Sequence, residues 1–376
     1  MIISRTPYRI SFFGGGTDYP AWFQQHGAAV LATTINRYCY ITCRFLPPFF
    51  DHLSRVVWSK IEVVGDNTEI EHPVIREVAR YLKIEEGIEV HHNGDLPARS
   101  GLGSSSAFTV GLLHAFRALQ GKIVSKHALA KLAIQIEQDV LKENVGVQDQ
   151  IQTAFGGLNR IDVMPNGSFN VRPIALHAER LAELESHMLL FYTGIARNAS
   201  DVAAAQIRAI GDRTRELHAI RSLVDDATEV LTGNAPIAEF GRLLHDSWEL
   251  KRKLSDQIAP PFVDDIYRRA IEAGALGGKL LGAGGGGFML FFVRPKQQAR
   301  VCQALSELLL VPVQLDWSGT QLIFYDPPQY SQTAHKRRDY KRYANGEREP
   351  RVVKPVLRVI HKNGTPRTAS MPRRRA

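Results

Sequence analysis

The stretch Leu96-Pro97-Ala98-Arg99-Ser100-Gly101-Leu102-Gly103-Ser104-Ser105-Ser106-Ala107 carries the strongest local signal in the chain. Its glycines let the backbone come close to a ligand, and it runs into a segment, 104–119, that is predicted to be a helix. A helix N-terminus offers unpaired N–H groups, so the combination predicts a polyphosphate site. The serine hydroxyls can add hydrogen bonds or bind a metal that bridges the phosphates. A flexible loop with a serine N-cap is the alternative, and the stretch is not a P-loop, because no Gly-Lys followed by Ser or Thr occurs in the sequence.

Working outward from this stretch, the pattern of apolar residues predicts both strands and helices. Segments 2–13, 28–45 and 186–193 are predicted to be strands, 125–142 a helix, and 200–254 mainly helical. Later in the chain, the glycine turn 282–287 is predicted to lead into an apolar strand, 288–293. Because strands and helices are mixed without strict alternation, the predicted fold class is α+β.

The predicted domain organisation has three parts. The turn signal Met164-Pro165-Asn166-Gly167 suggests a boundary that divides a first domain, 1–165, from a second, 166–327. The remaining residues, 328–376, form a basic tail. Residues 327–376 hold 14 Lys and Arg against 3 Asp and Glu, while the whole chain has a net charge of +9. The folded part is therefore nearly neutral, and the composition of the tail predicts disorder.

Composition excludes several classes of protein. No apolar stretch is long enough to span a bilayer and no secretory signal pattern opens the chain, so a cytoplasmic location is expected. Three cysteines, Cys39, Cys43 and Cys302, argue against a disulfide framework, and buried reduced thiols are expected. The basic tail could contact an anionic polymer or membrane surface, but a solvated extension without a specific role is the preferred interpretation. No specific nucleic-acid partner is expected, because the core is nearly neutral and lacks an aromatic and basic stripe.

Two acidic residues, Glu137 and Asp149, stand twelve positions apart. Glu137 lies beside the apolar stripe of a predicted helix, and Asp149 follows a break at Val145-Gly146-Val147. Phosphoryl transfer needs a carboxylate that holds Mg²⁺ and often one that orients or deprotonates the acceptor hydroxyl. The pair has the right chemistry, although taken alone the two residues would be interpreted as solvated surface acids.

Two further glycine clusters stand at opposite ends of the chain. Gly14-Gly15-Gly16-Thr17-Asp18-Tyr19 delivers an acid and an aromatic residue from a tight turn, which suits hydrogen bonding to vicinal hydroxyls. An ordinary hairpin turn is the alternative. Gly282-Ala283-Gly284-Gly285-Gly286-Gly287 has more glycine than a hairpin needs, which indicates close packing against a ligand or another loop.

The order of these motifs resembles the GHMP kinase superfamily. The N-terminal Pro-x-Arg with Gly-x-x-x-Asp-Tyr, the Pro-x-x-x-Gly-Leu-Gly-Ser-Ser run and the late Gly-Ala-Gly-x-Gly-Gly occur in that superfamily, and they cover roughly the first 325 residues. The resemblance implies an ATP-dependent phosphotransferase that uses Mg²⁺. It also implies a two-domain α+β fold with the active site in the cleft between the domains.

The resemblance also implies roles for individual residues. Asp149 would be the catalytic acidic residue with Arg9 beside it, and Ser105 and Glu137 would bind the metal. The ATP-binding residues would be Pro97, Arg99, Ser100, Gly101, Leu102, Gly103, Ser104, Ser105 and Ser106. The residues that contact the acceptor would be Gly15, Gly16, Thr17, Asp18, Tyr19, Arg197, Lys251, Gly284 and Gly285.

The opening of the chain departs from galactokinases. Gly15 and Gly16 replace the Glu-His of their substrate loop, and Tyr8 stands where the superfamily usually has Gly. The whole opening, 4–20, and the segments 96–108 and 277–287 look like D-glycero-D-manno-heptose 7-phosphate kinases. That likeness implies phosphorylation of the anomeric hydroxyl, giving a 1,7-bisphosphate for GDP-heptose and surface polysaccharide synthesis.

A phosphorylated acceptor needs a cationic pocket for its distal phosphate. The candidates are Arg99, Arg197 and the pair Lys251 and Lys253. Alternatives to this hypothesis are a superfamily kinase for another acceptor, such as fucose or an isoprenoid alcohol, and a catalytically idle sugar sensor. The expected partners are ATP and a sugar phosphate, with a homodimer as a candidate assembly.

Overall fold

The computed structural model describes residues 1–326 apart from 48, 99 and 196–198. The described strands are β1 (Ile2–Phe13), β2 (Ala28–Phe45), β3 (Ser54–Val57), β4 (Ile61–Val64), β5 (Ile88–Gly94), β6 (Leu158–Val163), β7 (Phe169–Pro173), β8 (Met188–Tyr192), β9 (Ala275–Leu280), β10 (Phe288–Val293), β11 (Leu309–Leu310), β12 (Leu315–Asp316) and β13 (Gln321–Tyr325).

The described α-helices are α1 (Pro20–His26), α2 (Pro73–Tyr81), α3 (Ser104–Leu119), α4 (Lys126–Gln135), α5 (Gln148–Phe155), α6 (Ala178–Ser186), α7 (Ala199–Ala209), α8 (Thr214–Thr232), α9 (Ala238–Arg252), α10 (Pro261–Glu272) and α11 (Gln298–Ala304). Short helical segments are η1 (Asn67–Glu69), η2 (Ile136–Val140), η3 (Ile210–Arg213) and η4 (Pro295–Gln297). The predicted α+β class is confirmed.

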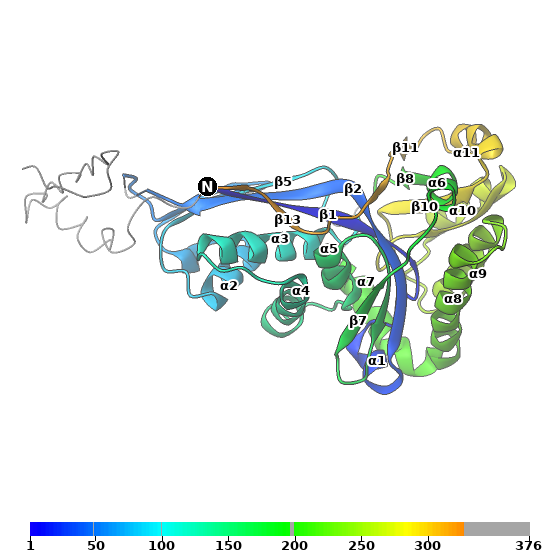
Figure 1. Cartoon of the computed structure of the whole chain (residues 1–376), viewed down its shortest axis with the longest axis horizontal. Helices are drawn as coiled ribbons and strands as arrows, with labels where there is room; N and C mark the ends of the chain where they lie inside the picture. Colours follow the sequence, from blue (N-terminus) through cyan, green and yellow to red (C-terminus); the bar gives the residue numbers. More distant parts are fainter. Residues whose placement is uncertain (48, 99, 196–198, 327–376) are drawn as a thin grey trace, which may run out of the picture. The chain divides into compact units, whose positions relative to one another are not determined.

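The larger sheet is built around the long strands β1 and β2. Its main path runs β13-β1-β2-β5-β3-β4; β6 and β12 also pair with β2, and β7 pairs with β6. β12 and β13 come from the end of the folded chain, so residues more than 270 positions apart lie side by side: Thr34 pairs with Asp316, and Arg5 with Gln321. In Figure 1, helices α2, α3, α4 and α5 lie on one side of this sheet.

Helix α3 is the central helix of this layer. It packs against β1 and β2, and its side chains are buried almost all round, including Phe108, Leu112 and Phe116. A helix that is apolar on all faces is stable only when it is covered on all sides. Here the sheet covers one side and α4 and α5 another. This burial fixes the N-terminus of α3, where the glycine- and serine-rich stretch ends.

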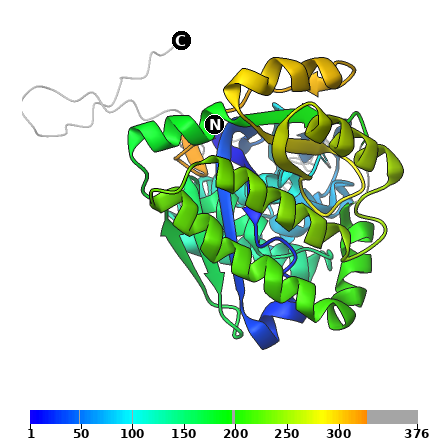
Figure 2. The same cartoon turned by 90° about the vertical axis from the view of Figure 1, so that its right-hand side faces the viewer.

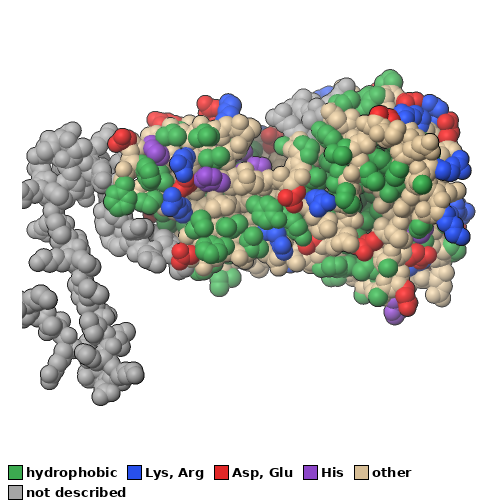
Figure 3. All heavy atoms as spheres, turned by 90° about the horizontal axis from the view of Figure 1, so that it is seen from above, with side chains coloured by type: hydrophobic (Ala, Val, Ile, Leu, Met, Phe, Trp, Pro, Cys, Tyr) green, Lys and Arg blue, Asp and Glu red, His purple; other side chains and the backbone are tan. Residues whose placement is uncertain are grey.

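Part of the opposite face of the larger sheet is uncovered in the view of Figure 3, where hydrophobic side chains are interspersed with basic ones and histidines, while α8 packs against β1 and β2. From Tyr38 to Arg44, β2 alternates between partly exposed and buried residues, which is typical of a sheet with one solvated face. On the edge strand β13, Ile323, Phe324 and Tyr325 are exposed. A homodimer stays a prediction.

The smaller sheet has the order β11-β8-β10-β9. Its strand β10 is buried throughout, as expected for an apolar run with helices close by. Helices α8 and α9 pack side by side, and Figure 2 shows them crossing the face turned to the viewer. Trp248, Phe291 and Ile266 lie in the hydrophobic cluster of this part of the molecule.

Most predicted elements are confirmed, with shifts at their ends. The helix expected over 125–142 consists of α4 followed by the π-helical segment η2. The turn at 164–167 is confirmed as the tip of the β6–β7 hairpin, where Gly167 N donates to Met164 O. The division into domains 1–165 and 166–327 stays a prediction. Cys39 and Cys43 are buried free thiols, and Cys302 is partly exposed.

Within the described part of the chain, no helix has the length and apolar character needed to cross a bilayer. The tail, 328–376, lies outside the described residues.

Candidate active site

An ion pair between Arg9 and Asp149 lies at the centre of the site. Arg9 Nε donates to Asp149 Oδ1 at 2.7 Å and Nη2 donates to Oδ2 at 2.6 Å, a bidentate geometry. The third donor, Nη1, bonds to Gly101 O at 2.6 Å. Arg9 comes from β1 and is 3% exposed, whereas Asp149, in the first turn of α5, is 25% exposed. One guanidinium therefore orients the acid and fixes it to the glycine loop.

The glycine loop has the conformation that glycine favours. Gly101 and Gly103 have φ values of 81° and 71°, in the left-handed region. A Cβ on Gly101 would lie 2.4 Å from Leu281 O, so the loop packs closely against the end of β9. Ser100 Oγ is buried without a hydrogen-bond partner among the described residues. An orphaned hydroxyl beside a helix N-terminus suits the phosphates of ATP.

The other predicted ATP-binding residues differ in exposure. Leu102 is buried, and its carbonyl accepts from Arg9 N at 3.0 Å. Pro97 and Ser105 are exposed, and Ser104 is partly buried. Arg99 lies outside the described residues. The structure therefore brings Ser100, Gly101, Leu102 and Gly103 to the Arg9–Asp149 pair, and the nucleotide contacts themselves stay predictions.

Glu137 is buried rather than on the surface. It lies in η2 with 1% exposure, so the interpretation of this residue as a solvated surface acid is wrong. Ser106 Oγ donates to Oε2 at 2.9 Å and Gln150 Nε2 to the same oxygen at 2.5 Å, while Oε1 has no described partner. Burial raises the pKa of Glu137 to about 7, helped by the charge of Asp149 and opposed by hydrogen bonds from Thr109, Gln150 and Ser106.

This environment is suitable for a divalent cation. Among the described residues no basic side chain forms an ion pair with Glu137, and a carboxylate is a ligand of the type that Mg²⁺ prefers. The described serine that contacts Glu137 is Ser106, on the buried side of α3, and not the predicted metal ligand Ser105, which is exposed. The metal-binding role of Ser105 and Glu137 stays a prediction.

The loop that follows β1 is organised by Asp18. Its Oδ1 accepts from Gly16 N at 3.0 Å and its Oδ2 from Gln148 N at 3.3 Å, so Asp18 joins this loop to the start of α5. Asp18 is 2% exposed, and burial together with the charge of Asp149 raises its pKa. Asp18 therefore positions Asp149, and its predicted contact with acceptor hydroxyls is not tested.

Other residues of the loop 14–19 also contact the protein itself. Thr17 Oγ1 donates to Gly14 O at 2.7 Å, and Tyr19 is buried, which raises the pKa of its hydroxyl. Gly16 faces Leu217 and Leu254. Gly15 is the member of the loop with polar side chains as its nearest neighbours.

Lys251 reaches the site from the last turn of α9. Its ammonium donates to Leu280 O at 3.2 Å and Gly282 O at 2.5 Å, and the residue is 7% exposed. Burial and, to a smaller extent, the positive charge of Arg9 lower its pKa to about 8, although Asp18 and Asp149 act in the opposite direction. A lysine ammonium has three donors, so one donor remains for a ligand.

The late glycine cluster packs against the glycine loop, as one of its two predicted roles requires. A Cβ on Gly282 would lie 2.5 Å from Gly101 Cα, and one on Gly287 would lie 2.3 Å from Ser100 O. Gly284 and Gly285 contact Ile258 instead, since Gly285 N donates to Ile258 O at 3.0 Å. Their predicted contact with the acceptor is not tested, and Arg197 lies outside the described residues.

Sequence reasoning missed Lys279 and the role of Gly146. Lys279 lies in β9 with 3% exposure, and its ammonium donates to Phe12 O at 2.8 Å. Burial and the nearby charges of Lys251 and Arg9 lower its pKa. The sequence signal that could have identified Lys279 is a lysine within an apolar strand, because buried lysines are rare without a specific partner.

Gly146 leaves room for the side chain of Asp18. A Cβ at position 146 would lie 1.8 Å from Asp18 Oδ2, so no larger residue fits there without a shift.

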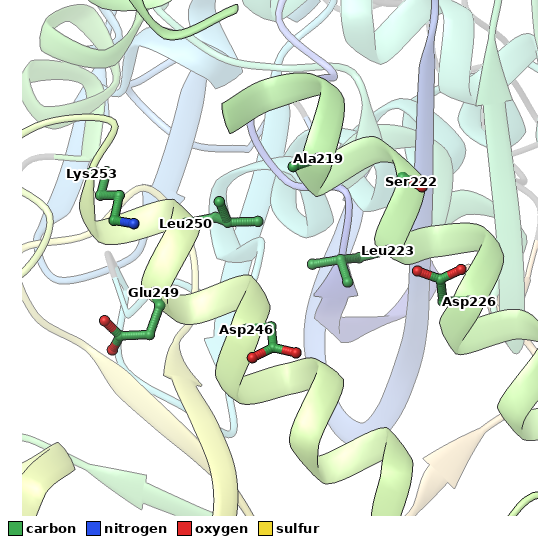
Figure 4. Close-up of a pocket in the computed structure, with 8 residues that line it drawn as sticks. All are labelled: Ala219, Ser222, Leu223, Asp226, Asp246, Glu249, Leu250 and Lys253. Carbon is green, nitrogen blue, oxygen red and sulfur yellow. The ribbon is translucent and has the colours of Figure 1, made fainter. Parts of the chain in front are cut away.

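A separate pocket of about 510 Å³ lies between α8 and α9 and contains none of the predicted site residues. Figure 4 shows its lining, with acidic side chains on both helices: Ala219, Ser222, Leu223, Asp226, Asp246, Glu249, Leu250 and Lys253. Among the described residues no group of three or more His, Cys, Asp or Glu has a geometry that could hold a metal ion. Lys253, a candidate for binding the distal phosphate, is exposed in this pocket, whereas Lys251 is buried at the active site.

A glycine loop at a helix N-terminus, an arginine-oriented acid and a second buried acid define a phosphotransferase site. Comparison with protein families gives the same result: residues 70–157 match the N terminal domain of the GHMP kinases, and residues 233–309 match their C terminal domain. The chain belongs to the GHMP kinase family.

The individual proteins that this chain is similar to include kinases of particular sugars. The chain is 30% identical to the D-glycero-alpha-D-manno-heptose 7-phosphate kinase of Campylobacter jejuni over 81% of this chain and 93% of that enzyme. It is 28% identical to the L-fucokinase/L-fucose-1-P guanylyltransferase of Bacteroides fragilis, of which it spans about a third (36%). The crystal structure of a D-glycero-D-manno-heptose 1-phosphate kinase from Bacteroides thetaiotaomicron has a TM-score of 0.71 and 26% identity, covering 87% of this chain and all of that one.

Proposed function

We propose that this chain is an ATP-dependent sugar kinase that phosphorylates the anomeric hydroxyl of D-glycero-D-manno-heptose 7-phosphate. The product is the 1,7-bisphosphate, which would supply GDP-heptose for surface polysaccharide. The observation that carries this proposal is the similarity to the Campylobacter enzyme along nearly its whole length. The Arg9–Asp149 pair supports the reaction type, because it places a carboxylate beside the glycine loop.

In the proposed reaction, the acceptor oxygen attacks the γ-phosphorus of ATP. The bond from the γ-phosphorus to the bridging oxygen breaks, ADP leaves, and Asp149 orients the acceptor hydroxyl or takes its proton. Arg9 occupies both oxygens of Asp149 on one side, and each oxygen keeps a lone pair for the acceptor. Mg²⁺, when bound, would neutralise charge on the transferred phosphoryl group, with Glu137 and Ser105 as the proposed ligands.

The distal phosphate requires a cation, and of the proposed candidates Lys251 is the one placed at the site within the described residues. Arg9 lies near Lys251 and Lys279, and burial lowers the pKa of Lys251 to about 8 and that of Lys279 well below its usual value. A polyanionic ligand at this place would favour the protonated form of both lysines. ATP and a phosphorylated sugar are ligands of this kind, and described residues use two of the three donors of Lys251.

A second candidate acceptor is a 6-deoxyhexose such as fucose. The similarity to bifunctional fucokinases favours it, at 28% identity for the Bacteroides fragilis protein and 23% for that of Arabidopsis thaliana. An isoprenoid alcohol is supported by the 28% identity to the mevalonate kinase of Pyrococcus horikoshii over 58% of this chain. Neither fucose nor mevalonate carries a phosphate that Lys251 would bind, although ATP would use the basic residues with any acceptor.

An ATP-consumption screen over free sugars, sugar phosphates and mevalonate tests the assignment. Charge-assisted contacts contribute about 1.5–3 kcal/mol each, so two of them should favour the 7-phosphate over free heptose by about 10²–10⁴ in kcat/KM. Lys251→Ala should reduce this preference, and Lys253→Ala, at the exposed neighbour, should not. Arg99→Ala and Arg197→Ala complete the set. Comparable efficiency on heptose and its 7-phosphate would refute the heptose-phosphate assignment and leave the kinase assignment standing.

A further inference from the structure

Gly15 is a glycine that the backbone does not need. Its φ lies outside the left-handed region, so any residue could adopt its conformation. A Cβ there would meet nothing closer than 3.5 Å, which is an ordinary contact distance. Gly14, its neighbour, differs on both counts, with φ of 84° and a Cβ position 1.9 Å from Ala29 O. Neither strain nor packing within the protein therefore explains a glycine at position 15.

The space beside Gly15 is bordered by two polar side chains. The atoms nearest to its Cβ position are Ser11 Oγ at 3.5 Å and Gln148 Nε2 at 3.6 Å. Both side chains have a buried oxygen, Ser11 Oγ and Gln148 Oε1, without a hydrogen-bond partner among the described residues. Ser11 itself is 6% exposed. A buried hydroxyl or amide without a partner is costly, so two of them around one point indicate that a ligand completes them.

This point adjoins the reacting groups. Ser11 lies two residues after Arg9 on β1, and alternate residues of a strand point to the same face. Gln148 precedes Asp149, and its backbone N is held by Asp18. Ser11 and Gln148 thus come from the two elements that carry Arg9 and Asp149, and their side chains meet beside Gly15.

We propose that Ser11 and Gln148 are specificity-determining residues that hydrogen-bond hydroxyl groups of the acceptor, in space that Gly15 leaves open. A sugar hydroxyl can accept from Ser11 Oγ and donate to Gln148 Oε1, because a hydroxyl is both donor and acceptor. A larger side chain at position 15 would occupy this subsite. The inference rests on the proposed function in taking the acceptor to be a polyhydroxylated sugar.

The first test is Gly15→Ala. The free protein accommodates the methyl group, so its unfolding midpoint should not change, but the KM for the acceptor should rise about tenfold. The KM for ATP should stay constant. Gly211→Ala is the matched control, since Gly211 also has an unstrained φ and nothing within 4 Å of its Cβ position. An unchanged acceptor KM in Gly15→Ala would overturn the proposal.

The second test compares Ser11 with Ser100, two buried serines whose hydroxyls have no hydrogen-bond partner among the described residues. Ser11→Ala should raise the acceptor KM about three- to tenfold with kcat retained, because it removes a uniform hydrogen bond. Ser100→Ala, in the glycine loop, should instead raise the KM for ATP. Ser11→Ala removes an unsatisfied hydroxyl from the free protein, so its unfolding midpoint should hold or rise. A lowered midpoint, or equal changes in both KM values, would show a structural role and refute the proposal.

Gln148→Leu keeps the backbone N–H that binds Asp18 and removes the amide. It should raise the acceptor KM as Ser11→Ala does, and a change confined to the ATP KM would refute its role. All three variants are assayed with the acceptor that the wild-type chain prefers in the screen. Preference for a sugar other than heptose 7-phosphate would overturn the heptose assignment and still leave these tests decisive.

Discussion

Glu137 and Asp149 are the two acids of the candidate active site, and they differ in whether a basic side chain neutralises their charge. Asp149 at the start of α5 is offset by the bidentate guanidinium of Arg9, and a quarter of its side chain is exposed. Glu137 in η2 is fully buried and has hydrogen bonds but no described cation, so its pKa rises to about 7. The first charge is balanced within the chain by Arg9. The second lacks a positive charge that a metal ion would supply.

Asp149→Asn should have the largest effect. The amide keeps the shape but loses the charge that orients or deprotonates the acceptor, so kcat should fall by about 10²–10⁴ while ATP binding persists. Steady-state kinetics and nucleotide titration measure the two quantities. Asp226→Asn, at an exposed acid of the α8–α9 pocket, is the control and should keep wild-type turnover. Near wild-type turnover in Asp149→Asn would remove this residue from the mechanism.

Glu137→Gln should act through the metal instead. Loss of a charged oxygen ligand should raise the Mg²⁺ concentration for half-maximal rate about tenfold or more, with saturating Mg²⁺ restoring part of the rate. If the Mg²⁺ titrations of the variant and the wild type coincided, the proposed difference between Glu137 and Asp149 would be refuted. Glu137 would then be a buried acid without a metal.

The raised pKa of Glu137 predicts a pH dependence of stability in the absence of Mg²⁺. Between pH 4.5 and about 7 the folded protein holds a proton that the unfolded chain has lost, so stability falls as pH rises through this window. The loss is at most about 3 kcal/mol at 1.36 kcal/mol per pH unit. Histidines with lowered pKa values, such as His72, titrate in the same window and contribute equally to both proteins, so denaturant unfolding should show a more negative slope of stability against pH in the wild type than in Glu137→Gln. Equal slopes would contradict the buried, uncompensated charge.

Gly146→Ala tests how Asp149 is held. The new Cβ would collide with Asp18 Oδ2, so the hydrogen bond from Gln148 N to Asp18 should be lost and α5 should shift at its start. We expect a destabilisation of about 1–3 kcal/mol and a reduced kcat, with the Mg²⁺ dependence set by Glu137 unchanged. A variant with wild-type stability and kcat would show that Asp18 does not position Asp149.

Deletion of residues 330–376 should have the smallest effect. The described contacts of Glu137 and Asp149 are made by residues within 1–326, and the composition of the tail predicts disorder, so kcat and the Mg²⁺ requirement should match those of the full chain. Circular dichroism provides the control for folding. A folded but inactive truncation would show that the tail completes the site.

The sequence by itself determined the elements and the motifs. The β-branched and aromatic residues of β1, the helical spacing of apolar residues in α4 and the glycine turn before β10 each depend on residues close in the chain, which is why their positions could be predicted. The glycine and serine stretch, Arg9 and Asp149 could be selected because their chemistry is local. The resemblance to the GHMP kinases then placed them in one site.

Only the tertiary structure decided which of these residues meet and in what environment. Several contacts join residues that are far apart in the sequence. Ser106 and Glu137 are 31 positions apart, and Phe12 and Lys279 are 267 positions apart. Strands β12 and β13 return to the larger sheet from the end of the folded chain, and Arg5 and Gln321 pair there although they are 316 positions apart. Periodicity carries no information about such pairs. Whether Glu137 is a solvated acid or a buried one depends on the desolvation that packing imposes, and that is a property of the assembled fold.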